Sequence, residues 1–139
     1  LLLLINQPLA VHRVVAGHLE LLLLAINDDV VLDDVVAAGV DGLNPIEPLA
    51  GMQIGDMKKR YGARLCLIGN IDCGHLLPHG TVEEVEAAVK DCIAQAGSGG
   101  GLILSSSNSI HSSVNPANYL AMIQAARKFG CYPLQASSP

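Results

Sequence analysis

Three short apolar segments of the chain are each followed by side chains that could bind a substrate or take part in a reaction. Asn44 and Glu47 follow the first segment, Asn70 and Asp72 follow the second, and the polar run Ser105–Asn108 follows the third. A carboxylate can act as a general acid or base, and amide and hydroxyl groups can hydrogen bond to a ligand. The same side chains could instead cap helices or fix loops, and the sequence leaves both interpretations open.

Three histidines lie close to these segments. His111 follows the serine-rich run, whereas His75 and His79 are four residues apart with Pro78 between them. An imidazole titrates near neutral pH and could therefore bind a ligand or transfer a proton. No matching cluster of cysteines or carboxylates accompanies the histidines, so the sequence predicts no metal site. Of the three, His111 is the strongest candidate for a functional role.

The cysteines indicate a reducing environment. The chain has four of them, Cys66, Cys73, Cys92 and Cys131, and no two form a Cys-x-x-Cys pair. Each stands singly in an apolar or helical context, which is typical of free thiols. We therefore expect reduced cysteines and a cytoplasmic location.

The candidate residues need a scaffold, and caps and apolar spacing predict its helices. Thr81 followed by Glu84 is a capping box, and Asn115 followed by Pro116 is a helix cap with proline at the first helical position. Two shorter helices are expected at Asp28–Ala38 and Ile54–Tyr61. Helical stretches end at Gly39, Gly62, Gly97 and Gly130. A glycine at such a position predicts the left-handed conformation that commonly ends a helix.

The strands are expected to be parallel. Leu65–Ile68 and Leu102–Leu104 are continuously apolar, as in strands buried on both faces, and a third strand is expected near Val40–Leu43. Strands that alternate with helices indicate an α/β fold. Polar residues at the carboxyl ends of the strands are typical of the active face of a (β/α)8 TIM barrel, or of the crevice of an open sheet. About four βα units would make up about half of a barrel.

Composition and charge exclude several classes of protein. The chain has 139 residues, of which 50% are hydrophobic and 15% charged, with a net charge of −5. Such a composition excludes a disordered chain, and the absence of a basic run argues against nucleic-acid binding. The longest apolar run, Leu21–Ile26, is too short to cross a membrane. We expect one partial domain over residues 1–139, with a tail at 134–139. Ten of the first 24 residues are leucine, so we treat residues 1–27 as uncertain sequence.

Three motifs of this chain resemble the uroporphyrinogen decarboxylase family. They are Asp41–Pro48, Gly69–Asp72 and Ser105–His111, and the third resembles a less characterised branch of the family. The resemblance extends over residues 28–133 and corresponds to the C-terminal half of the family's (β/α)8 barrel. It implies a carboxy-lyase that acts, without a cofactor, on tetrapyrrole acetate side chains in porphyrin biosynthesis.

The family also contains methyltransferases that carry methyl groups between a corrinoid and a thiol, using zinc. In this chain Leu23, Ala25 and Asn108 stand where the resemblance places the zinc ligands, so no metal is expected. A corrinoid-dependent methyltransferase-like protein is therefore the alternative. A non-catalytic half-barrel is a third interpretation, and it would need a partner to cover its open edges.

The resemblance and the strand ends together predict a site. The expected catalytic residues are Asp72, Glu47 and His111. The expected substrate contacts are Asn44, Asn70, Ser106, Ser107, Asn108 and His75. We expect one cavity in which Asn70, Asn108 and His111 hydrogen bond to Asp72. The expected partners are a small molecule, either a tetrapyrrole or a corrinoid, and a second copy of the chain or a missing N-terminal half. The isolated chain is expected to be inactive.

Overall fold

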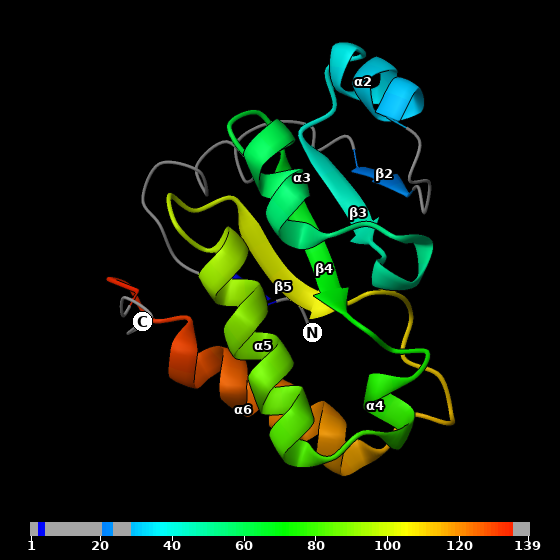
Figure 1. Cartoon of the computed structure of the whole chain (residues 1–139), viewed down its shortest axis with the longest axis vertical. Helices are drawn as coiled ribbons and strands as arrows, with labels where there is room; N and C mark the ends of the chain where they lie inside the picture. The colour runs from blue at the N-terminus through cyan, green and yellow to red at the C-terminus, as the bar shows by residue number, and fades with distance from the viewer. Residues whose placement is uncertain (1–2, 5–20, 24–28, 135–139) are drawn as a thin grey trace.

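A computed structural model of the chain describes residues 3–4, 21–23 and 29–134 (Figure 1). Most of the uncertain sequence at 1–27 and nearly all of the tail at 134–139 therefore lie outside the described residues. The described strands form one sheet in the order β1-β5-β4-β3-β2. Their bounds are Leu3–Leu4 for β1, Leu21–Leu23 for β2, Gly42–Ile46 for β3, Cys66–Ile71 for β4 and Leu102–Ser106 for β5.

Strands β2 to β5 are parallel neighbours in the order in which they occur in the chain. The three predicted strands, now β3, β4 and β5, are therefore parallel as expected. Strand β1 pairs antiparallel with β5, which the sequence did not predict. Parallel strands in sequential order are what a (β/α)8 barrel requires, because each strand lies beside the next.

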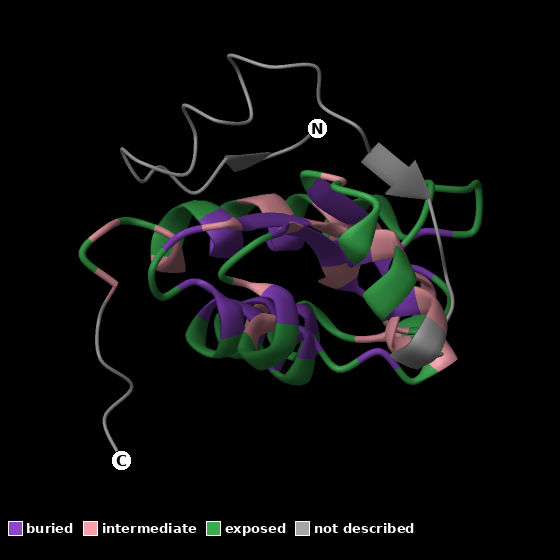
Figure 2. Ribbon diagram, turned by 90° about the horizontal axis from the view of Figure 1, so that it is seen from above, coloured by how far each residue is buried: buried purple, intermediate pink, exposed green. Residues whose placement is uncertain are grey.

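Helices alternate with these strands and pack on the sheet. They are α2 at Asp29–Ala37, the 3-10 turn η1 at Pro48–Ala50, α3 at Ile54–Tyr61, α4 at Leu76–His79, α5 at Val82–Ala96 and α6 at Pro116–Phe129. Helix α3 contacts β4, α5 contacts β4 and β5, and α6 packs on α5. In Figure 2 the central strands are buried, and the exposed residues gather on the outer sides of the helices and on the loops.

Side-chain hydrogen bonds confirm the two predicted helix starts at Thr81 and Asn115. The Thr81 hydroxyl accepts a hydrogen bond from the Glu84 amide at 3.2 Å, and the Glu84 carboxylate accepts one from the Thr81 amide at 2.8 Å. Asn115 begins α6, because its side-chain oxygen accepts a hydrogen bond from the Ala117 amide at 2.9 Å. Both caps satisfy amides that a helix start would otherwise leave without a partner.

The predicted glycine ends are confirmed at only one position. Gly39 is left-handed with a φ of 88°. Gly62, Gly97 and Gly130 have φ values of −64°, −74° and −88°, so the prediction is wrong for these three. At Gly97 a Cβ would lie 2.6 Å from the Ile93 carbonyl oxygen. Close approach to the preceding turn, and not a left-handed backbone, therefore favours glycine there.

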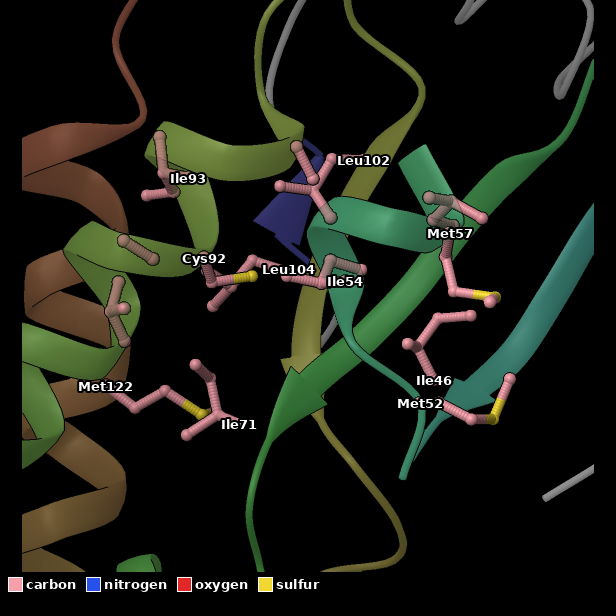
Figure 3. Close-up of a cluster of buried hydrophobic side chains, with 14 of the residues drawn as sticks. Ile46, Met52, Ile54, Met57, Ile71, Cys92, Ile93, Leu102, Leu104 and Met122 are labelled. Carbon is pink, nitrogen blue, oxygen red and sulfur yellow. The ribbon is translucent and has the colours of Figure 1, made fainter. Parts of the chain in front are cut away.

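The core lies between the sheet and the helices (Figure 3), where Ile71 of β4 and Met122 of α6 point toward one another. Side chains alternate along each strand. Leu67 belongs to this helix-side core, and the neighbouring Ile68 is buried but lies outside the cluster, on the opposite face of the sheet. The register pairs Ile68 with Ile103, which is also buried outside the cluster. The sheet is therefore buried on both faces, as its apolar strands predict.

Candidate functional site

The carboxyl ends of β3, β4 and β5 lie at one edge of the sheet because these strands are parallel. Asn44 is half-buried in β3, and the register places Asn70 of β4 beside Ser105 of β5. The side-chain amide of Asn70 lies 3.5 Å from the Met52 carbonyl oxygen. Gly69 has a φ of 145°, and a Cβ there would lie 2.9 Å from the Ile46 carbonyl oxygen. The close packing of β3 on β4 therefore fixes the strand end that leads to the candidate carboxylate.

Asp72 lies at the start of the loop that follows β4. Its Oδ1 accepts hydrogen bonds from the Gly74 amide at 2.7 Å and the His75 amide at 3.2 Å, and its Oδ2 accepts one from the Leu76 amide at 3.1 Å. The carboxylate thereby fixes the loop that leads into the short helix α4, whose N-cap residue is His75. A carboxylate has about four lone-pair positions. Three backbone amides therefore fix its orientation and leave it able to accept a further hydrogen bond.

Cys73 is the next residue, and Ser107 from the end of β5 contacts it. Ser107 is fully buried, and its backbone amide donates to the Ile71 carbonyl oxygen at 2.7 Å. The Ser107 hydroxyl oxygen accepts a hydrogen bond from the Cys73 amide at 3.3 Å and lies 3.5 Å from the Cys73 thiol. Ser107 thus joins the loops that follow β4 and β5.

His111 contacts the backbone carbonyl group of Cys73. Its Nε2 lies 2.9 Å from the Cys73 carbonyl oxygen, and its Nδ1 lies 3.3 Å from the Ser113 amide nitrogen. A carbonyl oxygen can only accept and a backbone amide can only donate. Both contacts therefore require the neutral ring with its proton on Nε2. In this arrangement both ring nitrogens form hydrogen bonds to the protein backbone.

The expected hydrogen bonds to Asp72 do not form. The side chains of Asn70, Asn108 and His111 each contact another group instead. The Asn108 side-chain oxygen accepts from the Ser109 amide at 2.8 Å, and the Asn108 carbonyl oxygen accepts from the Ser106 hydroxyl at 2.7 Å. Backbone amides of its own loop surround the Asp72 carboxylate instead. That part of the prediction is wrong, while the functional roles of these residues stay predictions.

Glu47 and His75 occupy the rim of the same edge. The Glu47 carboxylate accepts a hydrogen bond from the Leu49 amide at 3.0 Å and caps η1. His75 is exposed, and its ring centroid lies 5.6 Å from that of His79 in an edge-on contact. Among the described residues, no group of three or more His, Cys, Asp or Glu side chains could hold a metal ion.

Comparison with known proteins decides the family. The family model for uroporphyrinogen decarboxylase (URO-D) matches residues 11–129, which is most of the chain. The chain belongs to the URO-D family. A curated relative, the uroporphyrinogen decarboxylase of Thioalkalivibrio sulfidiphilus (strain HL-EbGR7), is 29% identical over 79 residues. That match covers 57% of this URO-D family chain and 22% of the relative.

A solved structure shows the same fold as this URO-D family chain. It is a methyltransferase from Methanosarcina mazei, with a TM-score of 0.59 and 25% sequence identity. The match covers 71% of this chain and 28% of that protein. The chain thus spans about a quarter of the length of the proteins that it matches. Its parallel strands and alternating helices form part of a (β/α)8 barrel, which confirms the predicted fold class.

Two residues near this URO-D family site were not among the expected catalytic residues and substrate contacts. Asn118 of α6 is buried, and its side-chain amide donates to the carbonyl oxygens of Leu77 at 3.1 Å and Gly80 at 2.7 Å. An asparagine within the apolar stripe of a helix is the signal that could have identified it. Ser105, paired with Asn70, precedes the serines that were named. Only the strand register shows which serine lies beside Asn70.

Burial alters the ionisation of two thiols and one ammonium group in this part of the fold. Burial raises the pKa of the Cys66 thiol to about 11 and that of Cys92, which lies in the core of Figure 3, to about 12. Burial lowers the pKa of the Lys58 ammonium, which donates a hydrogen bond to the Gly100 carbonyl oxygen. Cys66 begins β4 at the amino end of that strand, whereas Cys92 of α5 lies against the backbone of Asn70. Within the described parts of the chain, no helix has both the length and the apolar character needed to cross a membrane.

Proposed function

We propose that this chain supplies part of the substrate-binding wall of a carboxy-lyase that acts on the acetate side chains of a tetrapyrrole. The observation that carries the proposal is the Asp72 carboxylate, which three backbone amides hold at the carboxyl end of β4. Functional residues of (β/α)8 barrels lie at this end of the strands. Membership of the URO-D family and the name of the curated relative support the same substrate class.

The chemistry needs negative charge near the reacting ring. Loss of CO2 from an acetate arm is easiest when the attached pyrrole carries a positive charge, and a proton then replaces CO2 on the methylene carbon. A fixed carboxylate such as Asp72 stabilises that charge without reorganising. The amide groups of Asn44 and Asn70 and the hydroxyl of Ser105 are able to hydrogen bond to acetate carboxylates or to pyrrole N–H groups. Glu47 is the second carboxylate at this edge of the sheet.

Binding is the direct test, because the isolated chain is expected to lack turnover. Uroporphyrinogen, kept reduced under anaerobic conditions, is titrated into the chain in a calorimeter. We expect Asp72→Asn to weaken binding roughly tenfold or more, as expected for a lost hydrogen bond between a charged group and its ligand. Asp34→Asn is the matched control, because Asp34 is an exposed carboxylate on α2. Equal affinity of the Asp72→Asn variant and the unmodified chain would refute the proposal.

The structural likeness to a methyltransferase supports a second candidate, methyl transfer from a corrinoid to a thiol. The chain is incubated with methylcobalamin and a thiol, with and without added zinc, and the visible spectrum of the corrinoid is followed. Loss of the methyl group changes that spectrum directly. Methyl transfer by a chain that does not bind uroporphyrinogen would favour this second function over the first.

A further inference from the structure

The segment after β5 contacts the Asp72 loop at every polar atom of Cys73. Ser107 accepts from the Cys73 amide and lies within hydrogen-bond distance of its thiol. His111 contacts the Cys73 carbonyl oxygen. Cys73 itself is buried, with an exposed fraction of 4%. Two residues from one loop therefore fix the backbone of a residue in another.

The position of Cys73 decides the geometry of the carboxylate. Cys73 lies between Asp72 and Gly74 in the sequence. The backbone amide of Gly74 is the first of the three amides that donate to the Asp72 side chain. A shift of the Cys73 backbone would turn that amide away from the carboxylate. Helix α6 holds the far end of the same loop, because Asn115 donates its backbone amide, and Asn118 its side-chain amide, to the Leu77 carbonyl oxygen.

We propose that Ser107 and His111 are positioning residues that hold the β4–α4 loop so that the Asp72 carboxylate keeps its orientation toward the ligand. The inference rests on the proposed function in one respect, namely that Asp72 faces the ligand. His111 acts through Asp72 as the neutral ring protonated on Nε2, and not by transferring a proton. The two ring contacts argue for this role, since a ring held by a carbonyl oxygen and a backbone amide has no free nitrogen.

Amide hydrogen exchange of the full chain, measured by NMR, tests the positioning. In His111→Ala we expect the amides of Gly74, His75 and Leu76 to exchange roughly tenfold faster, because one hydrogen bond to the loop is lost. His111→Gln should restore slow exchange, since a glutamine amide can donate to the Cys73 carbonyl oxygen. His79→Ala is the control, because the ring of His79 lies edge-on against the ring of His75 and not against Cys73.

The result separates positioning from a general contribution to stability. A purely structural role would accelerate exchange in α5 as much as in the loop, and it would show no rescue by glutamine. Either result would overturn the inference, as would a ring nitrogen spectrum showing the proton on Nδ1. Ser107→Ala provides a second variant with the same expected local effect, should His111→Ala not fold. If Asp72→Asn leaves uroporphyrinogen binding unchanged while the exchange results hold, the proposed function fails and the positioning stands.

Discussion

Asp72 shows how one side chain can serve both structure and chemistry. Its carboxylate accepts hydrogen bonds from three backbone amides and thereby fixes the loop that leads into α4. The same contacts fix a negative charge at the carboxyl edge of the sheet. The two interpretations that the sequence left open are therefore compatible, and mutations at Asp72 will change stability as well as binding.

Asp72→Ala is expected to lower the free energy of unfolding by about 1–2 kcal/mol, because the side-chain hydrogen bonds that fix the loop are lost. Asp72→Asn should cost less, because one side-chain oxygen can still accept from Gly74 and His75. Urea denaturation of both variants measures the difference. A loss in Asp72→Ala no larger than that in the exposed control Asp34→Asn would contradict this role of the carboxylate.

The thiols should differ sharply in reactivity. Cys131 is exposed, whereas burial raises the pKa of Cys66 to about 11 and that of Cys92 to about 12. Because the thiolate is the reactive form, an alkylating reagent at pH 8 should modify Cys131 first. Peptide mass spectrometry after timed quenching identifies the modified residue. Early modification of Cys92 in the folded chain would contradict its burial.

At the scale of single elements, sequence patterns predicted contacts correctly only where both partners lie close together in the sequence. The capping box of Thr81 and Glu84 spans four residues, so its spacing was enough to predict it. At Gly97 an added Cβ would lie 2.6 Å from the Ile93 carbonyl oxygen and 2.8 Å from the side chain of the distant Leu134, and local spacing does not encode the second contact. The contact of His111 with Cys73 depends on how two loops run beside each other, which spacing does not encode either. The partners of Asp72 lie within its own loop. The sequence therefore located the candidate residues but not their hydrogen bonds.

Asn118 links α6 to α4 through two hydrogen bonds. Asn118→Ala removes the donor to the carbonyl oxygens of Leu77 and Gly80, and only the Leu77 oxygen keeps a second donor, the Asn115 amide. We expect a loss of about 1–3 kcal/mol in the free energy of unfolding. Asn115→Ala, which removes only the cap of α6, should cost about 1 kcal/mol. Thermal denaturation of the two variants compares them, and a smaller loss for Asn118→Ala would contradict the link.

At the scale of the whole molecule, the predicted fold class held because it depends on repeated patterns. Three apolar runs separated by helices were enough to predict β3, β4 and β5 as parallel neighbours. The antiparallel β1 was not predicted, since a two-residue strand has no periodicity to detect. Both faces of the sheet are apolar, and thiols buried in strand β4 and helix α5 also control how the fold responds to alkali.

The free energy of unfolding should fall as the pH rises from about 9 to 11. Thiols in the unfolded chain ionise near their ordinary pKa of 9.0, whereas folded Cys66 and Cys92 stay protonated up to about 11 and 12. The folded state thus binds more protons in this window, and its stability decreases with pH. The raised pKa of Tyr132 acts in the same direction, and the lowered pKa of Lys58 opposes it.

Urea denaturation at several pH values measures this slope. Cys92→Ala should flatten this slope, because it removes the thiol whose pKa burial raises to about 12. Cys131→Ala should leave the slope unchanged, since Cys131 is exposed. An increase of stability between pH 9 and 11 in the unmodified chain would contradict the burial of these thiols.

The strict alternation along β4 and β5 also limits how this scaffold can change over evolutionary time. Inserting or deleting one residue within β4 would exchange the helix-side Leu67 for Ile68 and misplace every side chain beyond it. The loops that begin at Asp72 and Ser107 are free of this constraint, because their side chains do not alternate between the two faces of a sheet. New reactions would therefore arise by changes in loop length at the carboxyl edge, while the strands beneath accept only substitutions that preserve size.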